Sequence, residues 1–240
     1  LETDRPETIR YGAGSPYVDI QLPCGGGLEI LLVPRPDRQV LEEMLEDHAA
    51  RRASTITIDI ESGDMSIAVN GSTGRSENTL SIRIEPEIMF NIFGKGPEAS
   101  TLAALANAAG YDAMLFSPDH ETLDAGSAAG CSTRQLDKAE FPDDLSADDR
   151  TAILLFFHDH DWEPPILSGA LSTPAFYIGA KGSRRASETR LLALEEMGVP
   201  VESRSRLRGP IGLSPSARDP KTLAVSVLAE VLDVAMQGAP

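Results

Sequence analysis

Short apolar runs alternate with helix-like segments across residues 88–236, and this alternation constrains the fold more than any other feature. The expected strands cover residues 88–93, 112–116, 151–157 and 175–178. The expected helices cover residues 97–109, a segment starting at 163–165, 184–197 and 219–236. Strands that alternate with helices at this spacing predict a parallel α/β sheet with helices on both faces.

The first third of the chain has a different pattern. Short strands are expected at 17–20 and 28–33 around a glycine bend, and period-two alternation predicts strands at 54–60, 65–69 and 79–85. Helical spacing predicts one helix at 37–52, and residues 70–79 are expected to form a polar loop. We therefore expect an α/β protein with a small mixed domain over residues 1–87, followed by a Rossmann-like parallel-sheet domain over 88–240. Within the second domain, residues 118–150 are expected to form a loop-rich acidic stretch. Because the chain starts at Leu1 and not at Met, we expect the first domain to be truncated at its start.

Composition narrows the function classes. The 240 residues carry a formal charge of −16, which argues against nucleic acid as a partner because phosphate backbones need a basic face. No run of 18 apolar residues predicts a membrane span. Two cysteines, Cys24 and Cys131, are too few for a disulfide framework and favour a cytoplasmic setting. Residues 181–221 are locally basic, which fits either a confined anion site or a solvated helix face.

A thiol followed by three glycines stands in the segment LPCGGGL at 22–28. The glycines Gly25, Gly26 and Gly27 lack a Cβ, so they turn easily and let a ligand approach the backbone closely. Cys24 is then a candidate ligand-binding thiol. The alternative interpretation is a buried Cys that acts as a small hydrophobic residue beside a tight turn.

The segment Gly94-Lys95-Gly96-Pro97-Glu98-Ala99 matches the dinucleotide pattern G-x-G-x-x-[GA] directly after an expected strand. In such a turn Gly94 reverses the chain, Gly96 lets the backbone meet a phosphate, and the small Ala99 lets helix and strand pack. With Pro97 in the first helical turn, the free N–H groups would face an anion. The pattern indicates a nucleotide-like or phosphate ligand, or else a Rossmann turn that holds none.

One feature of the dinucleotide pattern is missing. The second strand is expected to end at Phe116-Ser117, and the next acid, Asp119, comes two residues too late to take ribose hydroxyls in the usual way. This argues against NAD, although Ser117 would tolerate a 2′-phosphate. Hydride chemistry is not predicted from the glycines.

Two further loops follow expected strands. His158 and Asp159 open the run HDHD at the carboxyl end of the third strand, where open α/β sheets bind ligands. We expect a loop that caps the next helix and contacts ligand, with a metal site or a solvated loop as alternatives. The second loop leaves the fourth strand and predicts another anion site or an ordinary turn. Its candidate residues are Gly179, Gly182, Ser183, Arg184 and Arg185.

Together these segments resemble the XdhC/CoxI family of xanthine dehydrogenase accessory factors. The matching stretches are RYGAGSP at 10–16, LPCGGGL at 22–28, FGKGPEA at 93–99, HDHDWEPPIL at 158–167, AFYIGAKGSRR at 175–185 and GPIGL at 209–213. Lys95 departs from the resemblance, which favours a small residue there.

The resemblance implies a chaperone, not a turnover enzyme. Such a protein binds molybdenum cofactor, a pterin dithiolene phosphate, and delivers it to an apo-molybdenum hydroxylase of the xanthine dehydrogenase type. On this interpretation the loops above bind the cofactor and Cys24 lies next to molybdenum. An NAD(P)-dependent oxidoreductase and a regulatory domain without ligand are the alternatives. We also expect a homodimer, because twofold pairs are the commonest assemblies.

Overall fold

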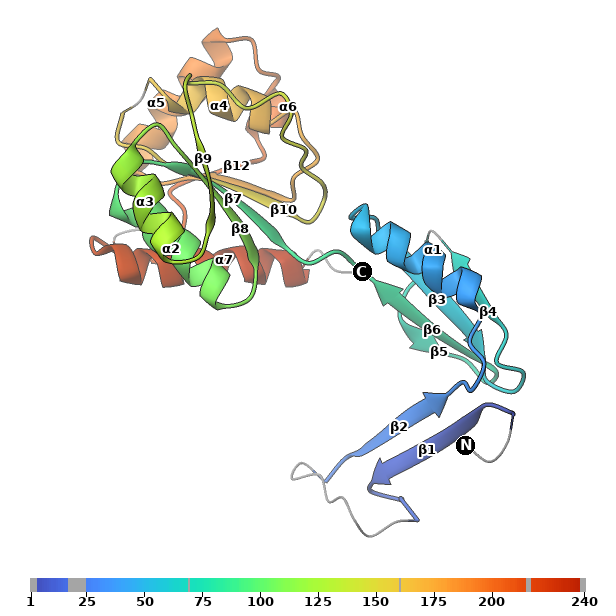
Figure 1. The fold of residues 1–240 in the computed structure, drawn as a ribbon. Helices are drawn as coiled ribbons and strands as arrows, with labels where there is room; N and C mark the ends of the chain where they lie inside the picture. The colour runs from blue at the N-terminus through green and yellow to red at the C-terminus, as the bar shows by residue number, and fades with distance from the viewer. Residues whose placement is uncertain (1–3, 17–24, 69, 160, 215–216, 238–240) are drawn as a thin grey trace. The chain divides into compact units, whose positions relative to one another are not determined.

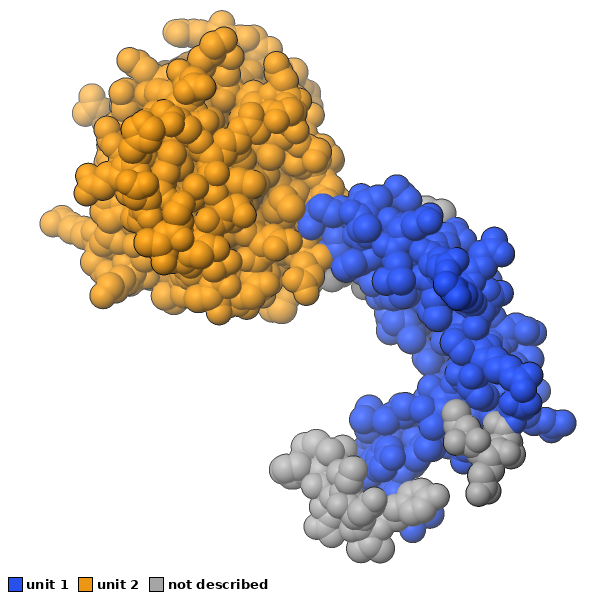
Figure 2. Space-filling view, viewed as in Figure 1, with its two compact units in different colours: residues 1–86 blue, residues 87–240 orange. Residues whose placement is uncertain are grey.

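A computed structural model describes residues 4–16, 25–68, 70–159, 161–214 and 217–237 (Figure 1). The chain divides into two compact units, Leu1–Pro86 and Glu87–Pro240, coloured separately in Figure 2. No helix in the described ranges combines the length and the apolar content needed to cross a bilayer.

Unit 1 contains two antiparallel sheets and one helix. Strands β1 (Glu7–Gly12) and β2 (Gly27–Leu32) form a hairpin ladder. The second sheet has the order β4-β3-β6-β5. Its strands are β3 (Ser54–Asp59), β4 (Met65–Ala68), β5 (Gly74–Arg75) and β6 (Thr79–Ile84). Strands β1 and β5 were not expected, and the strand predicted at 17–20 lies outside the described residues.

Helix α1 (Arg38–Ala49) begins where the sequence predicts. The Asp37 carboxylate accepts hydrogen bonds from the backbone N–H groups of Gln39 and Val40, which caps the first turn. The helix nevertheless contains no fully buried residue. Its apolar stripe is therefore only partly removed from water.

Unit 2 is a doubly wound α/β domain with an all-parallel six-stranded sheet of order β12-β11-β10-β7-β8-β9 (Figure 1). Its strands are β7 (Met89–Gly94), β8 (Asp112–Ser117), β9 (Ser132–Gln135), β10 (Thr151–Phe156), β11 (Tyr177–Ala180) and β12 (Leu207–Arg208). Its helices are α2 (Pro97–Ala108), α3 (His120–Ala128), α4 (Glu163–Ala170), α5 (Arg184–Glu196), α6 (Val201–Arg204) and α7 (Pro220–Gln237). The predicted α/β class and its Rossmann-like parallel sheet are confirmed.

Two apolar clusters, one on each face of this sheet, hold the layers together. On one face, Phe90 and Ile92 of β7 pack with buried residues of α2 and α7. On the other, Phe93 of β7 packs with residues of α4. Alternate residues of one strand thus serve opposite faces, and β10 is buried along its whole length. Helices on both faces are what the sequence predicts.

The prediction that 118–150 is loop-rich is wrong in its first half, which contains α3 and β9. Helix α3 buries only Thr122, Leu123 and Gly126. A Cβ at Gly126 would lie 2.6 Å from Leu115 Cδ2, so the helix needs a glycine to approach the sheet. A face this small and weakly apolar gives almost no periodic signal.

Candidate functional site

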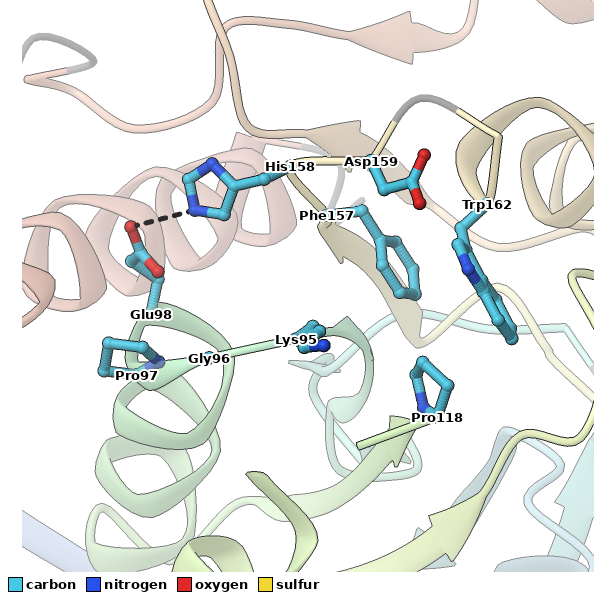
Figure 3. A pocket seen from close by; sticks show the side chains of 9 residues that line it. All are labelled: Lys95, Gly96, Pro97, Glu98, Pro118, Phe157, His158, Asp159 and Trp162. Carbon is cyan, nitrogen blue, oxygen red and sulfur yellow. Dashed lines mark ion pairs between the residues drawn. The ribbon is translucent and has the colours of Figure 1, made fainter. Parts of the chain in front are cut away.

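A cavity of about 870 Å³ opens at the carboxyl ends of the parallel strands in unit 2. Strand β7 lies at the centre of the sheet, with β8 on one side and β10 on the other. The chain therefore leaves the central strands in opposite directions, and ligands of open α/β sheets bind at such a switch point. The lining residues are Lys95, Gly96, Pro97, Glu98, Pro118, Phe157, His158, Asp159 and Trp162 (Figure 3).

The glycine turn between β7 and α2 is tightly packed at Gly94 and at Ala99. A Cβ at Gly94 would lie 2.7 Å from Phe156 Cβ and 2.8 Å from the Phe156 carbonyl oxygen. It would also lie 2.9 Å from Ala99 Cβ, and Ala99 itself is fully buried. These two small residues let α2 start directly against β7 and β10, as the dinucleotide pattern predicts for its packing positions.

Gly96 faces open space in the cavity wall. It has φ +91°, a backbone conformation that favours glycine, and a Cβ there would meet no atom nearer than Glu98 Oε2 at 3.8 Å. The Gly96 N–H donates to Thr122 Oγ1 at 2.8 Å, and the Thr122 hydroxyl donates to Asp119 Oδ2 at 2.6 Å. A ligand can approach this backbone closely, but the Gly96 N–H already has a partner.

The Asp119 carboxylate already has hydrogen-bond partners within the protein. Its carboxylate caps α3 by accepting from the Thr122 N–H, and it lies 3.6 Å from Lys95 Nζ. The hydrogen bonds from the Thr122 side chain and backbone hold the pKa of Asp119 below its ordinary value. The acid that the sequence places two residues late therefore stabilises the start of α3.

The polar side of the cavity is built around Glu98. Its carboxylate pairs with Lys181 Nζ and lies 3.6 Å from His158 Nε2 (Figure 3). Lys181 Nζ is also 3.2 Å from His158 Nε2. Burial alone would raise the pKa of Glu98, but the hydrogen bond from Lys181, its own backbone N–H and the nearby positive charges lower it. Glu98 is therefore a carboxylate at neutral pH.

A buried ion pair fixes the loop that carries Lys181. Arg190 of α5 donates to both Glu163 oxygens, through Nη2 at 3.0 and 3.1 Å and Nε at 3.2 Å, and both side chains are 2% exposed. The same Nη2 donates to the Lys181 carbonyl oxygen at 2.9 Å. These hydrogen bonds hold the backbone at Lys181, whose side chain pairs with Glu98 of the cavity lining.

The other side of the cavity is apolar and flat. Phe157 and Trp162 stack with ring centroids 5.8 Å apart and an interplanar angle of 17°. Figure 3 shows these rings with Pro118 on one side and Glu98 with His158 on the other, with Lys95 and Gly96 between. The cavity thus offers an aromatic wall to a planar ring system and cations to an anionic group.

His158 and Asp159 lie in this cavity, but the predicted helix-capping role is wrong. Helix α4 has Trp162 at its N-cap with no side-chain cap hydrogen bond. The Asp159 carboxylate instead accepts from the Asp161 N–H at 3.1 Å. Among the described residues, no cluster of three or more His, Cys, Asp or Glu side chains could hold a metal ion.

The second glycine loop lines the cavity less than expected. Gly179 is buried under neighbouring side chains, since a Cβ there would lie 2.6 Å from Ile211 Cγ2 and 2.7 Å from Tyr177 Cε1. Gly182, with φ +150°, turns the chain, and the Ser183 hydroxyl caps α5 by accepting from the Ala186 N–H. The exposed Arg184 and Arg185 are not among the residues lining the cavity. A ligand role for these five residues stays a prediction.

Gly25 and Gly26 belong to unit 1, at the end of the β1–β2 hairpin, where the Ala13 N–H donates to the Gly26 carbonyl oxygen at 3.0 Å. A Cβ at Gly25 would have nothing within 4 Å, and this residue has φ +69°. The thiol of Cys24 lies outside the described residues. Its ligand role therefore stays a prediction.

Sequence reasoning did not assign Lys95, Glu98, Pro118, Phe157 or Trp162 to the site, and it placed Lys181 only in the second glycine loop, without its partner Glu98. The signals for two of them were present. Trp162 is the chain's single tryptophan and follows a strand end by a few residues, and Lys181 lies between the glycines of the second loop. Glu98 occupies a variable position of the dinucleotide pattern, so its position gives no such indication.

The parallel sheet, its switch-point cavity and the glycine turn at the start of α2 define a Rossmann-type domain. Residues 90–231 match the family model of the XdhC Rossmann domain. The chain belongs to the XdhC family.

Relatives match the whole chain or large parts of it. It is 35% identical over 237 residues to the molybdenum cofactor insertion chaperone PaoD of Escherichia coli, covering 98% of this chain and 68% of that protein. It is 28% identical over 167 residues to a probable xanthine dehydrogenase subunit of Bacillus subtilis, covering 66% of this chain and 46% of that protein. A crystal structure described as a xanthine dehydrogenase from Bacillus halodurans shares the fold, with a TM-score of 0.74 and 18% identity over 98% of this chain and 76% of the other.

Proposed function

We propose that this protein binds molybdenum cofactor and delivers it to an apo-molybdenum hydroxylase of the xanthine dehydrogenase type. The observation that carries the proposal is the two-sided cavity at the switch point of unit 2. The similarity to a protein named for molybdenum cofactor insertion supports it, as does the similarity to a probable component of xanthine dehydrogenase.

The residues of the cavity fit the chemistry of this cargo. A pterin is flat and aromatic, and it would pack against Phe157 and Trp162. The cofactor's phosphate would approach the open Gly96 turn, with Lys95 and Lys181 as counter-charges. The described part of the cavity has no cysteine, so a protein thiol next to molybdenum would have to come from outside it.

A carrier role accounts for the chemistry of the lining residues. Their polar members bind and orient, whereas Asp119, which would have to accept ribose hydroxyls in an NAD enzyme, is committed to capping α3. The proposal therefore includes no turnover by the protein alone. The cytoplasmic setting and the homodimer stay predictions.

The test is to mix the purified chain with isolated molybdopterin and follow Trp162, whose fluorescence we expect to be quenched on binding. A Trp162→Phe variant, read by the fluorescence of the oxidised pterin, controls for non-specific quenching. The loaded protein is then expected to activate an apo-hydroxylase. A parallel titration with NADP separates the alternatives, because NADP binding with hydride exchange and no response to molybdopterin would contradict the proposal.

A further inference from the structure

The position that a ligand phosphate would take in unit 2 already holds a carboxylate of the chain. Helices that follow the first strand of a Rossmann-type sheet bind anions at their N-termini. In α2 that end carries Glu98, whose carboxylate pairs with Lys181 Nζ and lies 3.6 Å from His158 Nε2. The Glu98 side chain is 14% exposed and lines the cavity, so a ligand that enters there meets this carboxylate.

The first donors of α2 leave little room for a second anion. Pro97 has no N–H, and the Gly96 N–H donates to Thr122. The Glu98 N–H is therefore the first in the helix that could meet a ligand, and it belongs to the residue whose carboxylate lines the cavity. Lys181, which is 20% exposed against 62% for Lys95, is engaged by the same carboxylate.

We infer that Glu98 is a built-in competitor for the anionic group of the ligand. A phosphate that enters the cavity must displace the Glu98 carboxylate from Lys181 and from the start of α2. Binding is then weakened by the free energy of the contacts that are lost, and the returning carboxylate assists release. This inference rests on the proposed function, since a carrier must both hold and give up its cargo.

The experiment compares wild type with Glu98→Gln, which keeps the shape of the side chain and removes its charge. The probes are inorganic phosphate, inorganic pyrophosphate and isolated molybdopterin, titrated at fixed ionic strength. Because a hydrogen bond to a charged group contributes about 1.5–3 kcal/mol, we expect each phosphate-bearing probe to bind the variant about tenfold more tightly or better.

The matched control is Glu121→Gln. Glu121 is an exposed carboxylate in the first turn of the neighbouring helix α3, so this variant changes the net charge equally. It is expected to bind each probe within about twofold of wild type, because Glu121 is exposed and its charge is screened by salt. Thermal melts of all variants check folding, and Glu98→Ala serves as a second variant should Glu98→Gln fail to fold.

The outcomes separate this inference from the proposed function. Tighter binding by Glu98→Gln alone supports the competitor role, and equal tightening by Glu121→Gln overturns it because charge alone would then explain the effect. Equal or weaker binding by Glu98→Gln overturns the inference while the proposed function stands, provided wild type binds molybdopterin. Failure of both proteins to bind molybdopterin overturns both.

Discussion

The two units of this chain fold on different physical terms. Unit 2 buries large apolar side chains on both faces of its sheet, among them Phe90, Ile92 and Phe93, all fully inaccessible. In the described part of unit 1, the buried apolar residues are Ile56, Ile58 and Pro86. Large apolar side chains are exposed in both units, for example Leu45 of unit 1 and Leu192 of unit 2 at 60% each, so the difference lies in what is buried.

The ion pairs of the two units also differ in how deeply they are buried. Unit 2 contains the Glu163–Arg190 pair at 2% exposure, whereas unit 1 joins its two sheets through Glu29, which pairs with Arg10 and Arg75 at the surface. Small domains bury a smaller fraction of their surface, so backbone ladders and surface contacts must do more. The unit with the larger buried core is the one that contains the cavity at the strand ends.

Truncation of a core side chain is expected to give the largest difference in stability loss between the two units. Replacing Phe90 by Ala is expected to lower the free energy of unfolding of unit 2 by about 3–5 kcal/mol, because the ring leaves a cavity between β7 and its covering helices. Ile82→Ala in unit 1 removes a side chain that is 39% exposed and should cost under about 1 kcal/mol. Urea unfolding followed by Trp162 fluorescence reports unit 2, and circular dichroism reports the whole chain. Equal losses would mean that unit 1 has a stronger core than its burial indicates.

The two ion pairs give a second test. Glu163→Gln leaves Arg190 buried without its counter-charge and is expected to destabilise unit 2 by about 3–5 kcal/mol. Glu29→Gln should cost about 0–1 kcal/mol, since exposed pairs exchange with water. Both values come from the same urea experiment. A small effect at Glu163 would show that water reaches this pair in solution.

Glycine substitutions are expected to give a smaller difference in stability loss between the two units. Gly94→Ala puts a methyl 2.7 Å from Phe156 Cβ and should cost about 1–3 kcal/mol through overpacking. Gly74→Ala in β5 meets nothing within 4 Å and should change stability by no more than about 0.5 kcal/mol. Thermal melts compare the two. If Gly94→Ala were neutral, the close approach of α2 to β10 would be wrong.

The smallest expected effect is the acid response of the cavity. The pKa of Glu98 lies below its ordinary value of 4.5, so its pairing with Lys181 stabilises the folded state at pH values above 4.5. That contribution is lost as the pH falls through the lowered pKa of the folded state. The melting temperature of wild type should therefore fall more than that of Glu98→Gln between about pH 5 and pH 3, measured in one buffer series. If the melting temperatures of wild type and Glu98→Gln fell equally with pH, Glu98 would not contribute to the acid response.

The fold of unit 2 was largely predictable because its strands are apolar along their length and its helices begin at recognisable residues. The apolar run that forms β10 is buried along its whole length. Helix α5 begins after Ser183, which caps it, and in unit 1 Asp37 caps α1 in the same way. Helix α3 and strand β9 were missed for a physical reason. The buried face of α3 is made of small residues, and β9 is a polar edge strand.

The site was predictable only in part. The turn at Gly94 and Gly96 and the loop at His158 both follow strands, and parallel strands end at one edge, so their convergence in the cavity follows from the pattern. The partners of Glu98 could not be predicted, because Lys181 lies 83 residues away from it in sequence. The aromatic wall likewise depends on a loop conformation that brings Trp162 onto Phe157.

The sequence by itself determined the parallel α/β class, the positions of most helices and the glycine turn at the start of α2. Those features are local, since periodicity and capping act within a few residues along the chain. The tertiary structure alone decided which charges meet in the cavity and that the chain's own carboxylate occupies the start of α2. Such contacts join segments that are distant in sequence, and only the packing of strands and helices brings them within hydrogen-bonding distance.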